Sequence, residues 1–183
     1  MKFIKTLFAG LFIIKIEPFE DDRGIFYRFY CEDEFNEINH SKKIVQINYS
    51  HTKKKGTIRG LHFQYAPKME IKMIKCIKGA VFDVAVDLRK DSPTFLQWYG
   101  EELSPDNMQL IYIPEGFAHG FQSLKKDSEL IYLHTEFYSP GYEGGIRYND
   151  PKINIEWPLK PKLVSYRDKN FKLLDDTFRG LII

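Results

Sequence analysis

Short stretches in which apolar and polar residues alternate recur along the chain, and they predict a protein built from β-strands. In the stretch 80–89 (AVFDVAVDLR), Phe82 and Val84 share one face, while Asp83 and Asp87 share the other. Gly, Pro, Asn and Asp separate the stretches, which span residues 11–16, 24–30, 43–50, 56–64, 70–79, 80–89, 97–103, 108–114, 119–124 and 129–138. Many short strands at this spacing are typical of a β-sandwich or barrel, and a double-sheet jelly roll is favoured.

Helical patterns are sparse. Residues 32–38 (EDEFNEI) predict a short helix, and residues 104–107 (SPDN) predict a turn or a single helical turn capped by Ser104. About 25 residues at the end of the chain have no strand pattern and are expected to cover one end of the jelly roll. We therefore expect a single domain over residues 1–183.

The N-terminal stretch MKFIKTLFAGLFIIKIE begins like a signal peptide, but Lys5 interrupts its apolar run and no A-x-A-like cleavage site follows. The run is also shorter than the roughly 20 residues that a membrane-spanning helix needs. A turn at Ala9-Gly10 followed by the strand 11–16 is the better interpretation. These features predict a soluble protein without a membrane partner, located in the cytoplasm.

Composition narrows the function classes further. A net charge of +2 with 28% charged residues is too balanced to indicate binding to nucleic acid or to an anionic membrane. The two cysteines, Cys31 and Cys76, form no CxxC or Cys/His cluster, which argues against a structural zinc site. We expect both to be free thiols in a reducing compartment.

Two of the predicted strands carry polar residues where a simple sandwich would have an apolar face. Strict alternation places His62 and Gln64 together in residues 56–64, and Asp83 and Asp87 together in residues 80–89. Either these faces contact solvent or they line a polar pocket inside the barrel, where such folds bind small ligands.

Neither a metal site nor a cofactor site is indicated by the motifs. The five histidines form no HxH or HExxH pattern, and the chain has no GxGxxG, P-loop or GxSxG motif. Single polar residues on separate predicted elements remain as candidates: His62, Lys72, His119, Tyr132 and Asp168. Each also has a purely structural interpretation, such as a hydrogen-bonded core histidine, a lysine that snorkels from an outer face, or a packed tyrosine.

Six segments together resemble the dTDP-4-dehydrorhamnose 3,5-epimerase family. They are DDRGIF near residue 23, RGLHFQ, the VFDVAVDLRKDSPTF run (81–95), LSPDNMQLIYIPEGFAHGF (103–121), the NDP…IEWP run (149–158) and VSYRD near the C-terminus. The resemblance covers about residues 11 to 170, in order and with compatible spacing. It implies an all-β, cupin-type jelly roll, a homodimer that exchanges strands, and activity without metal or cofactor on a nucleotide-linked 4-keto-6-deoxy sugar.

The resemblance also implies roles for individual residues. In the catalytic set His62 is the base, Asp168 orients its imidazole, Lys72 stabilises an oxyanion and Tyr132 is the proton donor on the far face. A further set resembles positions that contact the sugar, the diphosphate or the nucleoside: Arg23, Gln46, Asn48, Arg59, His119, Tyr138, Glu143 and Arg167. Asp83 is expected to orient His119.

The chain departs from the family pattern at the nucleotide end. Arg28 stands where the family usually has a nucleotide-contacting glutamate, which reverses the local charge and replaces acceptors with donors. Alternatively, Arg28 faces solvent or pairs with Glu32 or Asp33. Arg167 stands where lysine is common, and Ile47 replaces a polar residue.

These departures leave several functions open. One is a related epimerase that acts on a CDP- or GDP-linked keto sugar, or that inverts only C3 or only C5. A non-catalytic sugar-binding jelly roll is disfavoured because His62, Tyr132 and Asp168 are all present. A keto-isomerase of the same fold is disfavoured because such relatives carry paired histidines on one strand, whereas RGLHFQ has one.

The stretch TIRGLHFQ (57–64) presents a geometric problem. Strict alternation places Arg59 and His62 on opposite faces of a strand, yet the resemblance requires both near one substrate. A glycine inside a strand often marks a bulge or a close approach of two backbones. We therefore expect an irregular strand around Gly60, or an Arg59 that reaches the site from its rim or across a dimer interface.

Overall fold

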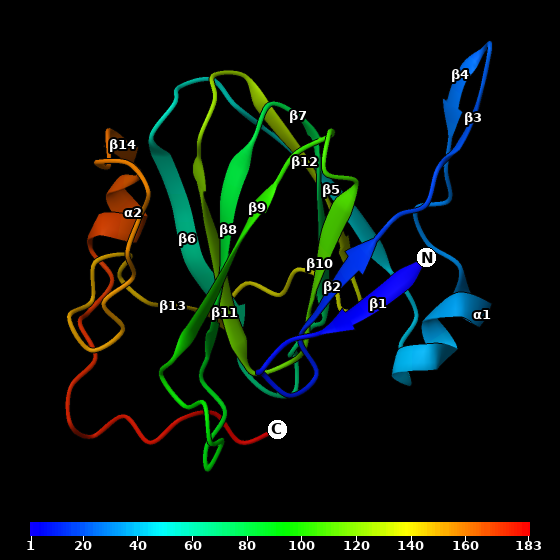
Figure 1. The fold of residues 1–183 in the computed structure, drawn as a ribbon. Coiled ribbons are helices and arrows are strands. Elements are labelled where there is room, and N and C mark those ends of the chain that lie inside the picture. Colours follow the sequence, from blue (N-terminus) through cyan, green and yellow to red (C-terminus); the bar gives the residue numbers. More distant parts are fainter.

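A computed structural model describes residues 1–183, and most of its strands form two antiparallel sheets that face each other (Figure 1). The first sheet has the order β1-β2-β10-β7-β12-β5. Its strands are β1 (Lys2–Lys5), β2 (Phe12–Lys15), β10 (Gln109–Ile113), β7 (Lys72–Lys78), β12 (Ser128–His134) and β5 (Gln46–Thr52).

The second sheet has the order β13-β6-β11-β8-β9, and the short strand β14 pairs with β6 in parallel. Its strands are β13 (Glu143–Gly145), β6 (Thr57–Gln64), β11 (Phe117–Ser123), β8 (Val81–Asp87), β9 (Trp98–Leu103) and β14 (Leu163–Val164). This arrangement is the predicted cupin-type jelly roll.

The main core lies between the two sheets, where alternate residues of the facing strands meet. Ile74 and Ile111 from the first sheet belong to the same buried cluster as Ala85 and Phe121 from the second. Val84 on β8 faces the other way, into a second cluster that the C-terminal residues cover. Both faces of β8 are therefore covered.

The N-terminal arm, which we define as residues 17–40, leaves the sheets and returns. It contains the hairpin of β3 (Phe19–Asp21) and β4 (Gly24–Phe26), the helix α1 (Glu32–Phe35) and a 3₁₀ turn (Asn36–Ile38). Phe35 is fully buried against the outer face of the first sheet, whereas the hairpin projects beyond the barrel (Figure 1).

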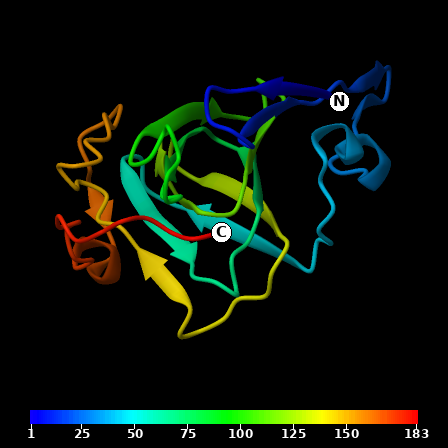
Figure 2. The same ribbon diagram turned by 90° about the horizontal axis from the view of Figure 1, so that it is seen from below.

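The C-terminal segment follows β14 and begins with the short helix α2 (Tyr166–Lys169). Its last residues cross one end of the barrel, as Figure 2 shows. Leu181 is anchored there by backbone hydrogen bonds to Leu88 and Lys90. The expected covering segment is thus present, and it also carries Asp168.

The strand predictions are confirmed for most of the barrel, as are the short helix, the turn at Ala9-Gly10 and the Ser104 cap. The stretch 24–30 is a strand only over β4, and β12 ends at His134 rather than at 138. Four short strands, β1, β3, β13 and β14, were not predicted.

Both cysteines are free, and no helix is long and apolar enough to cross a membrane.

Strand β6 is irregular at Gly60, as expected. His62 pairs with His119 of β11, but Arg59 pairs with Phe121, so three steps along β6 match two along β11. The extra residue inverts the alternation, and Arg59 and His62 consequently line the same cavity. Gly60 has φ +123°, and a Cβ atom there would lie 2.5 Å from the Cα of Gly120, so only glycine suits this position.

Candidate active site

A cavity of about 620 Å³ opens between the two sheets. Strands β5, β7 and β12 of the first sheet form one wall, and β6, β11 and α2 form the other. Among its lining residues are Asn48, Ser50, Arg59, His62, Lys72, His119, Tyr132, His134, Arg167 and Asp168. A smaller space of about 150 Å³ shares Asn48, His62, Lys72 and His134 with it, and is also lined by Gln46, Glu70, Tyr138 and Glu143.

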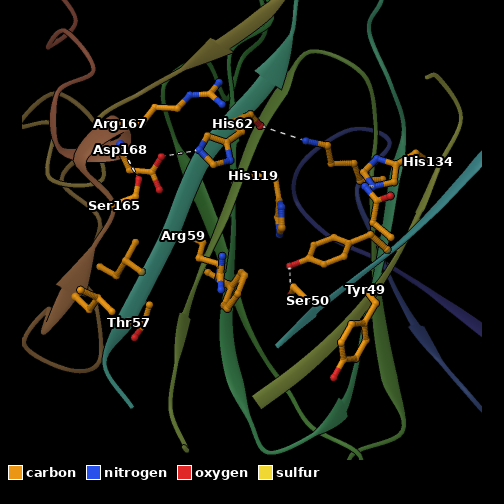
Figure 3. A pocket seen from close by; sticks show the side chains of 16 residues that line it. Tyr49, Ser50, Thr57, Arg59, His62, His119, His134, Ser165, Arg167 and Asp168 are labelled. Atoms are coloured by element: carbon orange, nitrogen blue, oxygen red, sulfur yellow. Dashed lines mark hydrogen bonds and ion pairs between the residues drawn. The ribbon is translucent and has the colours of Figure 1, made fainter. Parts of the chain in front are cut away.

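A histidine–carboxylate pair lies on the β6 side. His62 Nε2 is 2.8 Å from Asp168 Oδ1, and the His62 side chain is 39% exposed while that of Asp168 is buried. Because the carboxylate can only accept a hydrogen bond, Nε2–H of His62 donates to it and the lone pair of the imidazole is on Nδ1. His62 therefore has the arrangement of an oriented general base (Figure 3).

The local fold holds Asp168 in place. Ser165 caps α2 by accepting a hydrogen bond from the backbone N–H of Asp168 at 3.0 Å, and the N–H of Gly60 donates to Asp168 Oδ2 at 3.1 Å. Burial opposes ionisation of the carboxyl, but the hydrogen bonds from His62 and Gly60 outweigh it and lower the pKa of Asp168. Asp168 is thus a carboxylate that is held in a fixed position beside His62.

Tyr132 lies on the opposite wall. Its hydroxyl is 3.1 Å from Ser50 Oγ on the neighbouring strand β5, and its ring meets that of His119 edge to face at 6.1 Å. Burial raises the pKa of Tyr132 well above that of a free phenol. The hydroxyl therefore keeps its proton at neutral pH and is available as a donor.

Lys72 supplies a cation between these walls. Its Nζ donates to the backbone oxygen of His62 at 3.4 Å and lies 3.1 Å from Glu70 Oε1. The side chain is only 11% exposed. An ammonium group in such a setting can stabilise a developing negative charge because little water competes for it.

His119 and Asp83 form a second, fully enclosed pair. Nε2 of His119 lies 3.0 and 2.9 Å from the two oxygens of Asp83, whose side chain has no exposed surface. Asp83, which belongs to the polar face of β8, is therefore buried inside the barrel. Asp83 does not line the cavity itself, but it orients His119, which does.

Arg59 is an exposed residue of the cavity lining. Its Nε donates to Thr52 Oγ1 and its Nη2 to the backbone oxygen of His51, each at 3.1 Å. The remaining guanidinium donors are unused within the chain, and paired donors of this kind suit a phosphate.

The rim of the cavity carries the other residues predicted for substrate binding. Arg167 forms an ion pair with Glu143 at 3.0 Å, and the hydroxyl of Tyr138 donates to Glu143 at 3.2 Å. Gln46 accepts a hydrogen bond from the backbone N–H of Tyr138 and donates one to Asn48. These side chains, which come from β5, β13, α2 and the segment after β12, form one connected network.

Two predicted binding residues do not reach this cavity. Arg23 lies at the tip of the β3–β4 hairpin, where its 89% exposed side chain pairs with Asp21. Arg28 pairs with Glu34, which also accepts a hydrogen bond from the amino terminus of Met1. Arg28 thus faces solvent, which was one of the two alternatives, but its ion-pair partner is Glu34 rather than the expected Glu32 or Asp33.

The cavity also contains residues that the sequence patterns did not identify. His134 and Ser50 lie in its wall, and Glu70 lines the smaller space that adjoins it. His134 is two residues beyond Tyr132 on β12, so alternation alone would have placed it on the same face. Glu70 is the first residue of the predicted strand 70–79 and shares its alternation with Lys72, but in the structure it lies two residues before β7.

The fold and the site together define a class of protein. No group of three or more His, Cys, Asp or Glu side chains is placed to hold a metal ion. The cavity instead combines an imidazole–carboxylate pair, an ammonium group and a phenol, which suits proton transfer at carbon. The chain is a cupin-type jelly roll whose cavity contains the side chains that acid–base chemistry needs.

Comparison with known proteins gives the family. Residues 5–176 match the family model for dTDP-4-dehydrorhamnose 3,5-epimerase. The epimerase of that name from Salmonella typhimurium is 45% identical over 175 residues, which cover 94% of each chain. The chain therefore belongs to the dTDP-4-dehydrorhamnose 3,5-epimerase family and is an enzyme of the isomerase class.

Solved structures agree. The Bacillus anthracis dTDP-4-dehydrorhamnose 3,5-epimerase, determined with TDP and PPi bound, superposes with a TM-score of 0.91 at 41% identity. The match covers 94% of this chain and 99% of that one. The Legionella pneumophila dTDP-6-deoxy-D-glucose-3,5-epimerase in complex with dTDP-4-keto-L-rhamnose also has a TM-score of 0.91, at 37% identity, with 98% and 97% of the two chains covered.

Proposed function

We propose that the enzyme inverts C3 and C5 of a dTDP-linked 4-keto-6-deoxy sugar through an enolate. The observation that carries this proposal is the placement of the His62–Asp168 pair and Tyr132 on opposite walls of one cavity that also contains Lys72. The names of the similar enzymes support the choice of substrate.

The chemistry requires this division of labour. C3 and C5 flank the C4 ketone, so removal of a proton from either carbon leaves an enolate whose charge is on the C4 oxygen. His62 takes the proton from one face, and Lys72 stabilises the oxyanion. Tyr132 returns a proton to the same carbon from the opposite face, which inverts the centre. Exchange with solvent then restores the neutral imidazole and the phenol.

The remaining predicted residues hold the substrate in this proposal. Arg59 and His119 contact the sugar and diphosphate. Tyr138, Glu143, Arg167, Gln46 and Asn48 form the rim toward the nucleoside. No metal or cofactor takes part.

We further propose that residues 1–183 act as one epimerase domain and that two copies form a homodimer. Apolar side chains are exposed on the hairpin (Phe19, Phe26) and on the edge strand β5 (Ile47, Tyr49), which supports an interface there. Arg23, which is remote from its own cavity, would contact the substrate in the cavity of a partner.

Light scattering should give about twice the 21.6 kDa mass of one chain. A mass of one chain would contradict the dimer.

The nucleotide is tested by a panel of substrates. We expect the dTDP-linked 4-keto-6-deoxy sugar to be converted with the highest kcat/KM among dTDP-, CDP- and GDP-linked forms, as followed by NMR of the product. A preference for the CDP or GDP form would instead connect the reversed charge at Arg28 with a different base. Inversion of only C3 or only C5 would show a single-centre epimerase, and lack of conversion of all three would refute the proposed function.

A further inference from the structure

Three ionisable side chains meet in the wall of the smaller space that adjoins the cavity, on the β7–β12 side. They are Glu70, Lys72 and His134, and each is 10 or 11% exposed. Lys72 and His134 are direct cross-strand neighbours in the register of β7 and β12. Of the three, only Lys72 has a part in the reaction proposed above.

Glu70 joins the other two side chains. Its Oε1 is 3.1 Å from Lys72 Nζ, and its Oε2 is 2.7 Å from His134 Nδ1. Burial would raise the pKa of Glu70, but the hydrogen bond from His134 and the charge of Lys72 outweigh it, and the pKa is lowered. Glu70 is therefore a carboxylate whose two oxygens are both engaged.

His134 is itself held in place by its neighbours. Because the carboxylate only accepts, Nδ1 of His134 donates to Glu70, and Nε2 accepts from the side-chain amide of Asn48 at 3.3 Å. The imidazole also stacks on Tyr132, with the rings 6.1 Å apart and 22° from parallel. In Figure 3, His134 lies across the cavity from His62 and Asp168.

These contacts determine the direction of the Lys72 ammonium group. An ammonium group has three donors on a flexible four-carbon stem, so one contact alone leaves it mobile. One donor is directed to Glu70 and one to the backbone oxygen of His62. The third is then available to the cavity, where the enolate oxygen forms.

We propose that Glu70 is a positioning residue that aims the Lys72 ammonium at the substrate oxygen, and that His134 holds Glu70 in the required orientation. This inference rests on the proposed role of Lys72. The role assigned to Glu70 is geometric, because one of its carboxylate oxygens acts as an acceptor that fixes one donor of Lys72. A glutamine at the same position offers such an oxygen as well, whereas alanine offers none.

The test compares kcat and KM for Glu70→Ala, Glu70→Gln and His134→Ala. We expect Glu70→Ala to lower kcat by about 10- to 100-fold with little change in KM, since misplacement of a reacting group by about 1 Å costs up to about 100-fold. Glu70→Gln should retain kcat within about threefold of the wild type. His134→Ala should lie between them because it leaves the Glu70–Lys72 pair but frees the carboxylate.

A matched control exists on the same two strands. Lys78 and Glu129 form a cross-strand ion pair at 2.9 Å at the far end of β7 and β12, outside the cavity. Glu129→Ala should retain wild-type kcat. An equal loss in Glu129→Ala, an equal loss in a folded Glu70→Gln, or wild-type kcat in Glu70→Ala would each overturn the inference.

Melting curves for each variant separate misfolding from misplacement. If Glu70→Ala does not fold, His134→Ala decides, and a wild-type kcat in that variant overturns the inference. Lys72→Met distinguishes the two levels of the account. Full activity of Lys72→Met would refute the proposed role of Lys72, whereas an inactive Lys72→Met beside a fully active Glu70→Ala refutes the positioning role alone.

Discussion

Replacement of His62 with alanine is expected to abolish deuterium incorporation from the solvent at both C3 and C5 of the sugar. His62 is the proposed base, and its Nε2 is already engaged by Asp168, so Nδ1 is the atom that takes the proton. A positioned general base contributes about 10²- to 10⁴-fold to rate. The loss should be at least of this size in kcat, and it should be equal for both carbons because one base serves them.

The chain offers a matched control for this variant. His51 also pairs with an aspartate, Asp127, at 3.0 Å, but it does not line the cavity. His51→Ala should keep normal exchange at both positions, as measured by NMR in deuterated buffer. Full epimerisation by His62→Ala would refute the assignment of the base.

Replacement of Tyr132 with phenylalanine is expected to separate proton exchange from inversion. The variant keeps the aromatic packing against His119 and His134 but loses the only acidic hydrogen proposed for the far face. His62 can still remove a proton and return one to the same face. A positioned general acid contributes about 10²- to 10⁴-fold to rate. The rate of inversion should therefore fall by about 100-fold or more, while the rate of deuterium exchange falls much less.

Product stereochemistry and deuterium content, measured in the same sample, test this expectation. Tyr142→Phe is a suitable control because Tyr142 is exposed and lies outside the cavity. Inversion at the wild-type rate by Tyr132→Phe would refute the donor assignment. An equal loss of exchange and inversion would show that Tyr132 is needed already for proton removal.

Alternation predicted the barrel well because most of its strands bury one face in the core between the sheets. It failed where this cause is absent. Strands β3 and β4 project from the barrel with exposed residues, so β3 was not predicted and β4 was predicted too long. Strands β13 and β14 have only three and two residues, which is too short for a period to show.

The faces of β6 show a different limit. Alternation placed Arg59 and His62 on opposite sides, and a bulge at Gly60 brings them to one cavity. The glycine itself was the usable signal, because a close backbone approach excludes a Cβ atom there.

The site was predictable only in part. The resemblance to a family supplied the proposed roles of His62, Lys72, Tyr132 and Asp168, and the structure brings all four to one cavity. Periodicity could not have paired His62 with Asp168, since they are 106 residues apart and meet only because β14 adds to the edge of β6.

Other contacts depend on the folded chain alone. Arg23 lies on the hairpin of the N-terminal arm, outside the cavity of its own chain. No local sequence pattern indicates this position. The contact between Glu70 and His134 likewise joins residues that are 64 positions apart, which no local pattern indicates.

The position of deuterium in the product of the wild-type enzyme tests the central claim most directly. A dTDP-linked 4-keto-6-deoxy sugar is converted in deuterated buffer, and the product is examined by NMR. The account predicts inverted C3 and C5, each carrying deuterium, because the proton that Tyr132 returns comes from solvent. An inverted product that retains the original hydrogen at these carbons would contradict the enolate route between His62 and Tyr132.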